Sequence, residues 1–206
     1  MKKKWNAEEK LQIERELQAK GYKLIAGVDE VGRGPLAGPV VCAAVIMALE
    51  EDKLVEGVDD SKKVAEKKRE ELSIAIKLRS IAYNIVEIDA RTIDEINILE
   101  ATKLGMKKAI EGLSVRPDIV LTDGNMTLDI DIPQKSIVKG DALSYSIGSA
   151  SIVAKVFRDA MMDEYDEWFP EYKFAKNKGY GTAEHIQAIK EYGLCPLHRR
   201  TFTKKF

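Results

Sequence analysis

The 206-residue chain contains only two cysteines, Cys42 and Cys195, and two histidines, His185 and His198. No CxxC pair occurs, which argues against a zinc ribbon and against a disulfide framework. Two histidines are also too few for a histidine-rich metal site. Carboxylates must therefore hold any bound metal, and oxygen ligands favour a hard ion such as Mg²⁺ or Mn²⁺.

Long apolar runs and an excess of charge are also missing. No stretch of 18 apolar residues occurs, so the sequence predicts no membrane-spanning helix. The lysine-rich start, residues 1–4, leads into a charged segment and not into the apolar core of a secretion signal, so we expect a cytoplasmic protein. Lys and Arg number 33 against 34 Asp and Glu, a net charge of −1 that leaves room only for a local nucleic-acid-binding patch.

Apolar residues make up 45% of the chain and charged residues 33%, as in a globular protein. Periodicity predicts helices over residues 6–20, 64–80, 97–113, 143–168 and 182–192, the fourth either continuous or broken near Gly148. Strands are expected over residues 23–29, 39–47, 81–88, 117–122 and 135–139. This order predicts an α/β domain with a mixed five-stranded sheet flanked by helices. The first helix has a thin apolar stripe and should be peripheral, and the C-terminal residues should form a small helical appendage.

Acidic residues follow three of the expected strands. Asp29 and Glu30 close the first strand, Asp123 leaves the fourth, and Asp141 follows the fifth. If these ends converge, four carboxylates share one cleft, and their mutual repulsion calls for divalent cations. Two such ions about 4 Å apart support in-line phosphodiester hydrolysis.

Each acidic residue also fits a structural role when it is taken alone. Asp29 and Glu30 could be a solvated strand end, Asp123 an Asx-turn residue and Asp141 a helix N-cap. Neighbouring strand residues point to opposite faces, so Asp29 and Glu30 meet one site only if the chain turns there. The glycines that follow them allow such a turn.

Several ordered segments match a known family. They are GVDEVGRGPLAG (27–38), DSKK (60–63), DEINIL (94–99), DGN (123–125), KGD (139–141), ASIVAK (150–155) with RD (158–159), KGYGT (178–182) and HRR (198–200). Together they span about residues 23 to 202 and closely resemble ribonuclease HII. The resemblance implies an RNase H-like fold, with residues 1–22 as an N-terminal helical extension. Residues 23–206 form the catalytic domain, which includes a C-terminal helical segment over about 182–206.

The resemblance also implies an activity. It predicts a monomeric endonuclease, not bound to a membrane, that cuts RNA in RNA–DNA hybrids and nicks duplex DNA at single ribonucleotides. By family analogy, Asp29, Glu30, Asp123 and Asp141 hold two Mn²⁺ or Mg²⁺ ions.

The same resemblance assigns substrate contacts. The Gly32-Arg33-Gly34 backbone contacts the ribonucleotide 2′-OH, the group that distinguishes RNA from DNA. Tyr180 packs on the sugar at the RNA–DNA junction. Arg33 could pair with a phosphate or be solvated, and Ser61 and Lys62 could hold a phosphate of the uncut strand.

Three other positions lie outside these assignments. His185, on the last expected helix, should be a surface or partly buried residue. Gly148 and Asn177 depart from the residues that are usual in the family, which affects stability or substrate affinity but no carboxylate.

Two other functions fit the sequence less well. A nucleotide-binding enzyme could use the loop 32–38 as a phosphate cradle, but Pro35 removes a backbone donor there and a strand follows instead of a helix. A non-catalytic binder of RNA–DNA hybrids would be expected to lack a carboxylate, and all four are present.

Overall fold

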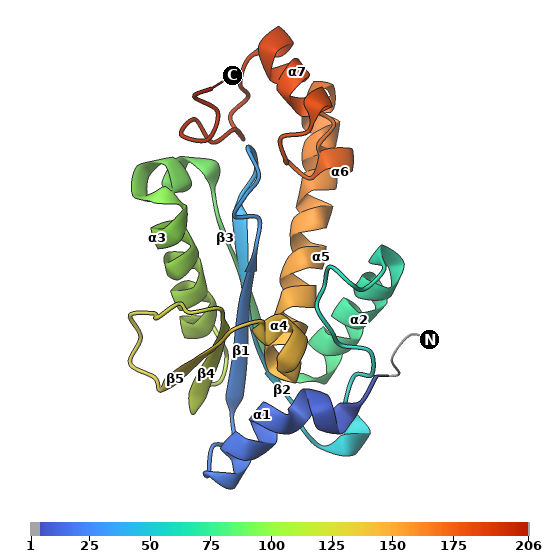
Figure 1. Ribbon diagram of the computed structural model, residues 1–206, viewed down its shortest axis with the longest axis vertical. Helices are drawn as coiled ribbons and strands as arrows, with labels where there is room; N and C mark the ends of the chain where they lie inside the picture. Colours follow the sequence, from blue (N-terminus) through green and yellow to red (C-terminus); the bar gives the residue numbers. More distant parts are fainter. Residues whose placement is uncertain (1–4, 206) are drawn as a thin grey trace.

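The computed structural model describes residues 5–205, so the lysine-rich start lies outside the described residues. Within this range one mixed sheet has the strand order β3-β2-β1-β4-β5 (Figure 1). Its strands are β1 (Ile25–Val31), β2 (Val40–Met47), β3 (Ser80–Ile88), β4 (Ile119–Asp123) and β5 (Gln134–Ile137). β2 pairs antiparallel with β1 and β3, whereas β4 pairs parallel with β1 and β5. The predicted five-stranded mixed sheet is confirmed.

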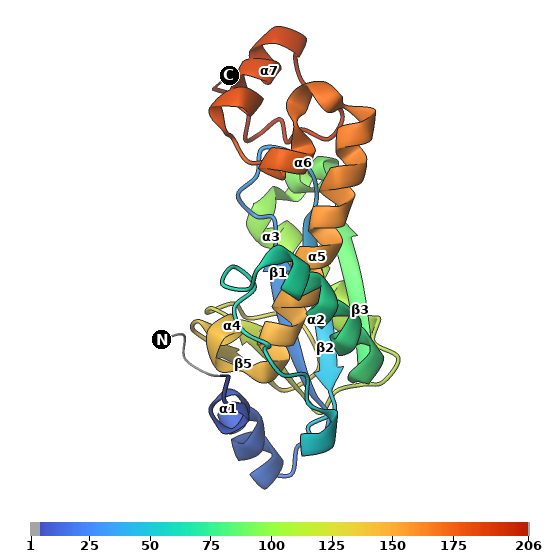
Figure 2. The same ribbon diagram turned by 90° about the vertical axis from the view of Figure 1, so that its right-hand side faces the viewer.

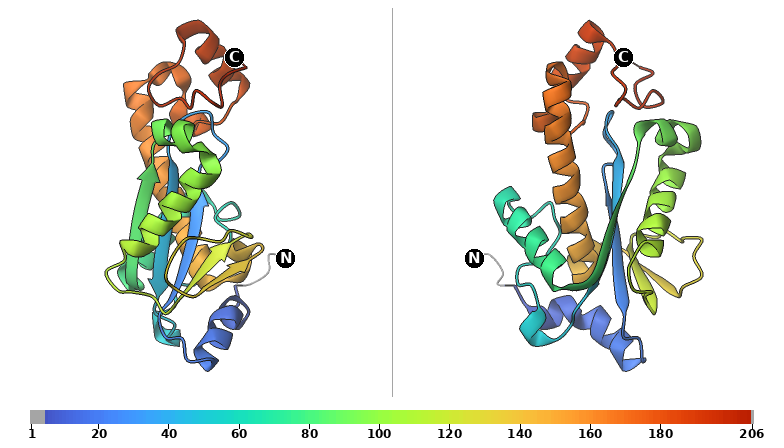
Figure 3. Two further views of the ribbon diagram at one scale, coloured as in Figure 1. Left: turned by 90° about the vertical axis from the view of Figure 1, so that its left-hand side faces the viewer. Right: turned by 180° about the vertical axis from the view of Figure 1, so that it is seen from behind.

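Helices cover both faces of this sheet (Figure 3). The longer ones are α1 (Ala7–Ala19), α2 (Glu66–Arg79), α3 (Ala90–Glu111), α5 (Tyr145–Trp168) and α7 (Ala183–Tyr192). Shorter turns are η1 (Glu51–Lys53), α4 (Gly140–Leu143), η2 (Pro170–Tyr172) and α6 (Phe174–Asn177). None of the helices in residues 5–205 is long and apolar enough to cross a membrane.

β2 explains why the sheet is covered on both sides. All eight of its residues are buried. Val41, Ala43 and Val45 join the core on the α5 side, whereas Cys42 and Ala44 join the core on the α3 side. A continuous apolar strand is what a central position between two helical layers requires.

The predicted helix over 97–113 began too late. The observed helix starts at Ala90, and its backbone is interrupted at Asn97, which has a φ of 67°. The Asn97 side-chain oxygen accepts hydrogen bonds from the amides of Leu99 and Glu100, so Asn97 caps the second half of the helix. The other open boundary, near Gly148, is settled in favour of one continuous α5.

Helix α1 lies at one end of the molecule, as expected of a peripheral helix (Figure 1), but its inner face is buried. Leu11 and Leu17 of α1 are buried in the core on the α5 side of the sheet. Glu14, between them, is 0% exposed and hydrogen bonds to Ser144 and Ser146. The apolar stripe is thin because a buried polar contact occupies its centre.

The C-terminal elements pack on the loop that follows β1 (Figure 2). The amide of Leu36 donates to the Gly179 carbonyl at 2.8 Å, and the amide of Arg199 donates to the Leu36 carbonyl at 2.8 Å. Ala37 of the loop shares a small core with Phe174 and Ile189. This segment therefore shapes the loop beside the acidic residues.

Candidate active site

The carboxyl ends of three neighbouring parallel strands carry the acidic residues. β4 pairs with β1 as far as Thr122 opposite Val28, which brings Asp123 beside Asp29. Asp141 lies in α4, directly after β5. The predicted convergence of strand ends is therefore present, because parallel strands in a sheet end at the same edge.

The turn that the glycines would allow at Glu30 is absent, because β1 continues through Val31. Asp29 faces the α5 layer and accepts a hydrogen bond from Ser151 of that helix. Glu30 faces the α3 layer, beside Leu99 and other residues that line a cavity. The two side chains leave opposite faces of the strand, but the charges of Glu30 and Asp123 act on Asp29 and the charge of Asp123 acts on Glu30, so the three carboxylates can share one site at the strand ends without a turn.

Burial and, after it, like charge raise the pKa values of this group. Burial, and then the nearby Glu30 and Asp123 carboxylates, raise the pKa of Asp29 well above its usual value. Burial also raises the pKa of Glu30, against a lowering effect of Arg33 at 3.5 Å. The pKa of Asp141 is raised by burial and then by the negative charges of Asp60 and Asp123. A nearby cation would stabilise the ionised carboxylates and so lower all three pKa values.

The donor chemistry fits a hard divalent cation, since every candidate ligand is a carboxylate oxygen. Within residues 5–205, however, no three or more His, Cys, Asp or Glu side chains form a group that could hold a metal ion as placed. The backbone already orients two of the carboxylates: Asp123 Oδ1 accepts from the Gly140 amide at 2.6 Å, and Asp141 Oδ1 from the Ala142 amide at 2.8 Å. Each of these bonds uses one oxygen, and a carboxylate has a second oxygen with which it can bind a cation.

Neither turn nor cap accounts for these two aspartates. Asp123 bonds across to the chain after β5 instead of closing its own turn. Asp141 lies inside α4, and the residue that caps α5 is Ser144, whose side chain accepts from the Ile147 amide. Asp29 is only 6% exposed, so it is not a solvated strand end.

The Gly32-Arg33-Gly34 segment is held from behind by a buried arginine. Arg199 is 0% exposed and donates to the carbonyls of Gly32 at 2.6 Å, Arg33 at 2.9 Å, and Gly38 at 2.8 and 3.0 Å. No peptide bond in the described residues is cis, and in a trans peptide the N–H points opposite to the C=O. The amides of Arg33 and Gly34 therefore point away from Arg199.

A second buried arginine, Arg158 of α5, holds the far side of the same loop. It donates to the carbonyls of Pro39 at 3.0 Å, Lys178 at 2.9 Å and Ala37 at 3.3 Å. Gly32, at a φ of 91°, lies against Arg158, and a Cβ there would come within 2.8 Å of the Pro39 carbonyl. Only glycine tolerates both the backbone angle and the contact.

Tyr180 lies beside this segment, as its proposed role requires. Its ring is 3.7 Å from the position that a Cβ on Gly34 would take, and the side chain is 47% exposed. Asn177 shapes the preceding turn: it donates to the Tyr172 carbonyl at 2.6 Å and accepts from the Gly179 amide at 2.8 Å.

His185 was expected at or near the surface, and this was wrong. It is 0% exposed, because its Nδ1 bonds to the Tyr180 carbonyl at 2.9 Å and its Nε2 to His198 Nε2 at 3.0 Å. His198 Nδ1 accepts from the Cys195 amide, so His198 donates through Nε2 and His185 through Nδ1. This chain of hydrogen bonds supports the backbone of Tyr180 from behind.

Ser61 and Lys62 lie near the carboxylates on the α5 side. The Ser61 hydroxyl is buried 3.0 Å from the Ser151 hydroxyl, which in turn bonds Asp29. Lys62 is exposed, and its charge opposes the rise in the Asp141 pKa. Their predicted phosphate contacts stay predictions.

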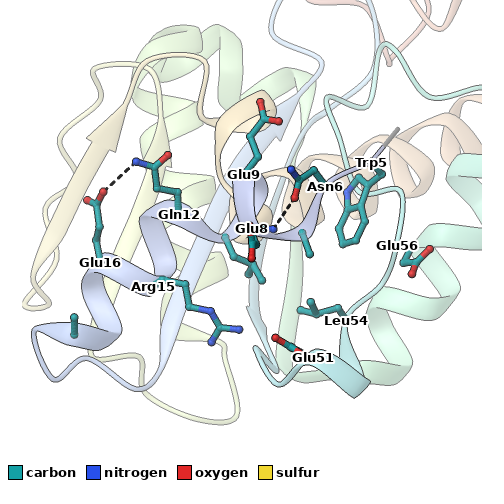
Figure 4. Close-up of a pocket in the computed structure, with 13 residues that line it drawn as sticks. Trp5, Asn6, Glu8, Glu9, Gln12, Arg15, Glu16, Glu51, Leu54 and Glu56 are labelled. Atoms are coloured by element: carbon teal, nitrogen blue, oxygen red, sulfur yellow. Dashed lines mark hydrogen bonds between the residues drawn. The ribbon is translucent and has the colours of Figure 1, made fainter. Parts of the chain in front are cut away.

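Two cavities differ in their position relative to the carboxylates and in their charge. One of about 410 Å³ adjoins the carboxylates and is lined by Glu30, Arg33, Leu99, Lys103 and Asp123 to Thr127. A larger one of about 1030 Å³ lies along α1 (Figure 4) and includes Glu8, Glu9, Glu16, Glu51 and Glu56. Such an acidic lining repels a polyanion, so the larger cavity does not fit a nucleic-acid substrate.

Comparison with known proteins decides the family. The model of the ribonuclease HII family matches residues 26–205. The chain belongs to the ribonuclease HII family. A ribonuclease HII from Acetivibrio thermocellus is 56% identical over 94% of this chain and 75% of its own length. A ribonuclease HII from Caldicellulosiruptor saccharolyticus is 54% identical over 94% of this chain and 93% of its own.

Solved structures agree with this assignment. The ribonuclease H2 of Pyrococcus horikoshii superposes with a TM-score of 0.76 at 25% identity, covering 89% of this chain and 96% of that one. The structure of Bst-RNase HIII with Mn²⁺ gives a TM-score of 0.68 at 19% identity, covering 88% and 68%, and shows the shared fold. The predicted RNase H-like fold is confirmed. The protein is a ribonuclease H, a nuclease hydrolase of a divalent-metal-dependent family that acts on RNA–DNA hybrids.

Sequence reasoning gave no role to Ser151, Arg158 or Arg199, although all three lie in the segments that resemble ribonuclease HII. A signal existed for Arg158, which lies one helical turn from the apolar residues Ala154 and Met162 on α5. A buried arginine without a carboxylate partner must find carbonyls instead. Which carbonyls it finds depends on the tertiary fold.

Proposed function

We propose that the enzyme cuts the RNA strand of RNA–DNA hybrids and also nicks duplex DNA on the 5′ side of a single ribonucleotide, leaving a 3′-OH and a 5′-phosphate. Asp29, Glu30, Asp123 and Asp141 hold two Mg²⁺ or Mn²⁺ ions. When bound, such ions supply an activated water and stabilise the leaving oxygen.

The clustering of carboxylates at the ends of β1, β4 and β5 carries this proposal. Asp29, Glu30 and Asp141 all have raised pKa values, and the Asp123 charge contributes to each rise. A structural acidic cluster would be expected to have basic partners, but among residues 5–205 only Arg33 forms an ion pair with one of the four, Glu30, at 3.5 Å. The Mn²⁺ in the Bst-RNase HIII structure is consistent with the same class of ion.

The backbone next to Asp29 and Glu30 recognises the ribonucleotide. The amides of Arg33 and Gly34 point away from Arg199 and donate to the 2′-OH, which a deoxyribose lacks. Tyr180, half-exposed beside Gly34, packs on the deoxyribose of the next nucleotide. With Glu30 engaged as a metal ligand, the Arg33 guanidinium would be free to pair with a phosphate.

One cleavage experiment tests the activity. Three duplexes are compared with Mg²⁺ and with Mn²⁺: one with a single ribonucleotide, a continuous RNA–DNA hybrid and an all-DNA control. We expect cutting of the first two, with product masses that show 3′-OH and 5′-phosphate ends. If the single-ribonucleotide duplex stays intact with both metals, the nicking proposal is wrong, and binding without cutting would favour the non-catalytic hybrid binder.

Two substitutions test the ligand set. Asp29→Asn and Asp123→Asn are expected to lower turnover at least a hundredfold and to weaken Mn²⁺ binding in calorimetry, since each removes a charged ligand. Asp131→Asn serves as the control, because that side chain is fully exposed beside Arg116. Near-parental turnover in either active-site variant contradicts the assignment.

The role of Tyr180 has its own test. Tyr180→Ala is expected to slow nicking at isolated ribonucleotides more than it weakens duplex binding, because the ring acts on one sugar. Equal nicking rates for the variant and the parent would rule out sugar packing.

A further inference from the structure

Helix α1 lies outside the part of the chain that matches the family model, yet it packs beside α4, the segment that carries Asp141 (Figure 1). Two of its side chains reach that segment. Lys10 Nζ donates to the Ala142 carbonyl and, at 2.7 Å, to Asp59 Oδ1. Glu14, one turn later on the same face, accepts from the Ser144 hydroxyl at 2.6 Å and from the Ser146 amide at 2.9 Å. The two side chains thus bind the C-terminal end of the short α4 and the start of α5.

The charged side chains of Lys10 and Glu14 are buried to a degree that is unusual for a helix at the surface. Glu14 is 0% exposed, and its second oxygen, Oε2, has no hydrogen-bond partner among the described residues. The Lys10 side chain is only 13% exposed. Burying a polar group that is only partly satisfied costs stability, and an apolar residue at position 14 would fill the core without this cost. The polar contact therefore serves something other than core packing.

The segment held by α1 cannot maintain its own shape. α4 has four residues, fewer than a helix needs to be stable alone. Its N-cap, Lys139, has a left-handed φ of 60° and makes no side-chain capping bond. A non-glycine residue in that conformation persists only where its surroundings impose it.

Helix α1 is linked to the Asp141 carboxylate through one residue, Ala142. Asp141 Oδ1 accepts from the Ala142 amide, and the carbonyl of the same Ala142 accepts from Lys10. Ser144, bound by Glu14, also caps α5 by accepting from the Ile147 amide at 3.2 Å. Any rotation of α4 must therefore break contacts with α1.

We propose that Lys10 and Glu14 are positioning residues, through which the N-terminal helix holds Asp141 facing Asp123 and thereby sets the affinity of the site for divalent metal. This inference rests on the proposed ligand role of Asp141. It gives the N-terminal helix a part in the chemistry.

Mn²⁺ binding to the full-length protein, measured by calorimetry without substrate, tests the proposal. Glu14→Gln and Lys10→Met are expected to raise the Mn²⁺ Kd about fivefold to tenfold. Lys10→Arg, which keeps a donor, is expected to remain within twofold of the parent. Glu16→Gln and Lys20→Met make the same chemical changes at exposed positions of the same helix and its end, and should bind Mn²⁺ like the parent.

Kinetics at 25 °C separate positioning from stability. The two variants should need more Mg²⁺ for half-maximal nicking, while KM for the duplex changes less than twofold. A purely structural role would lower Tm and leave the Mn²⁺ Kd and the Mg²⁺ requirement unchanged, and that result overturns the proposal. Lys10→Met supplies the test if Glu14→Gln fails to fold, because Lys10 lies nearer the surface.

Asp141→Asn separates the ligand role of Asp141 from the positioning role of Lys10 and Glu14. If it weakens Mn²⁺ binding while the Lys10 and Glu14 variants do not, only the positioning proposal fails. If Asp141→Asn itself binds Mn²⁺ like the parent, the ligand assignment fails and the positioning role fails with it.

Discussion

Arg199→Lys is expected to destabilise the protein even though it keeps the charge. Arg199 makes four hydrogen bonds to three carbonyls, those of Gly32, Arg33 and Gly38, from a side chain that is 0% exposed. A lysine presents its donors from a single nitrogen and cannot span these oxygens, which leaves at least two unpaired. Each unpaired buried carbonyl costs about 1–3 kcal/mol.

Part of this cost is offset. Burial, and next the neighbouring positive Arg158, lower the pKa of Arg199 to about 9, so the guanidinium is itself unfavourably placed. We therefore expect a net loss of about 2–4 kcal/mol in the free energy of unfolding, measured by urea denaturation followed by circular dichroism. Arg200→Lys is the matched control, because Arg200 is exposed.

The same substitution should affect recognition of the ribose. Without Arg199, the peptide units that follow Gly32 and Arg33 are free to rotate. The amides of Arg33 and Gly34 then no longer point consistently toward the 2′-OH. The ratio of nicking rates on a ribonucleotide and on a 2′-fluoro analogue should fall about tenfold, equivalent to one lost hydrogen bond of ~1.4 kcal/mol. Stability within about 0.5 kcal/mol of the parent, with an unchanged ratio, refutes this reasoning.

Three further outcomes are expected. Burial, and then His185, lower the pKa of His198 to about 4, so the unfolded chain binds more protons between about pH 6.5 and 4. The stability advantage of the parent over His198→Gln should therefore shrink on acidification through this range, by up to roughly 3 kcal/mol in urea titrations, and a constant difference contradicts it. Gly27→Ala should cost about 3 kcal/mol or more in the same assay, because its Cβ would overlap the backbone of Ser146 in α5; parental stability would show that the helix moves freely. Binding of a hybrid duplex should depend only modestly on salt for a chain of net charge −1, and a steep dependence would reveal a broad basic face.

The acidic pattern was predictable because it depends on local order. A buried strand followed by an acidic residue is visible in the sequence, and parallel pairing brings such ends to one edge. The sequence could not show that β1 continues past Glu30, because a glycine loop is equally compatible with an earlier turn. The sequence pattern also placed the start of this helix at Asn97. Asn97 does act as a cap, but it lies inside the longer helix α3.

The sequence by itself determined the α/β class, the mixed sheet, the family and the candidate carboxylates, since periodicity and short motifs are local properties. Only the tertiary structure decided which polar groups are buried and what they bind. Glu14 meets Ser144 from 130 positions away, and Arg199 meets Gly32 from 167 positions away. The sequence leaves the partner of each such polar group unspecified, because the partner is chosen by how the distant elements pack.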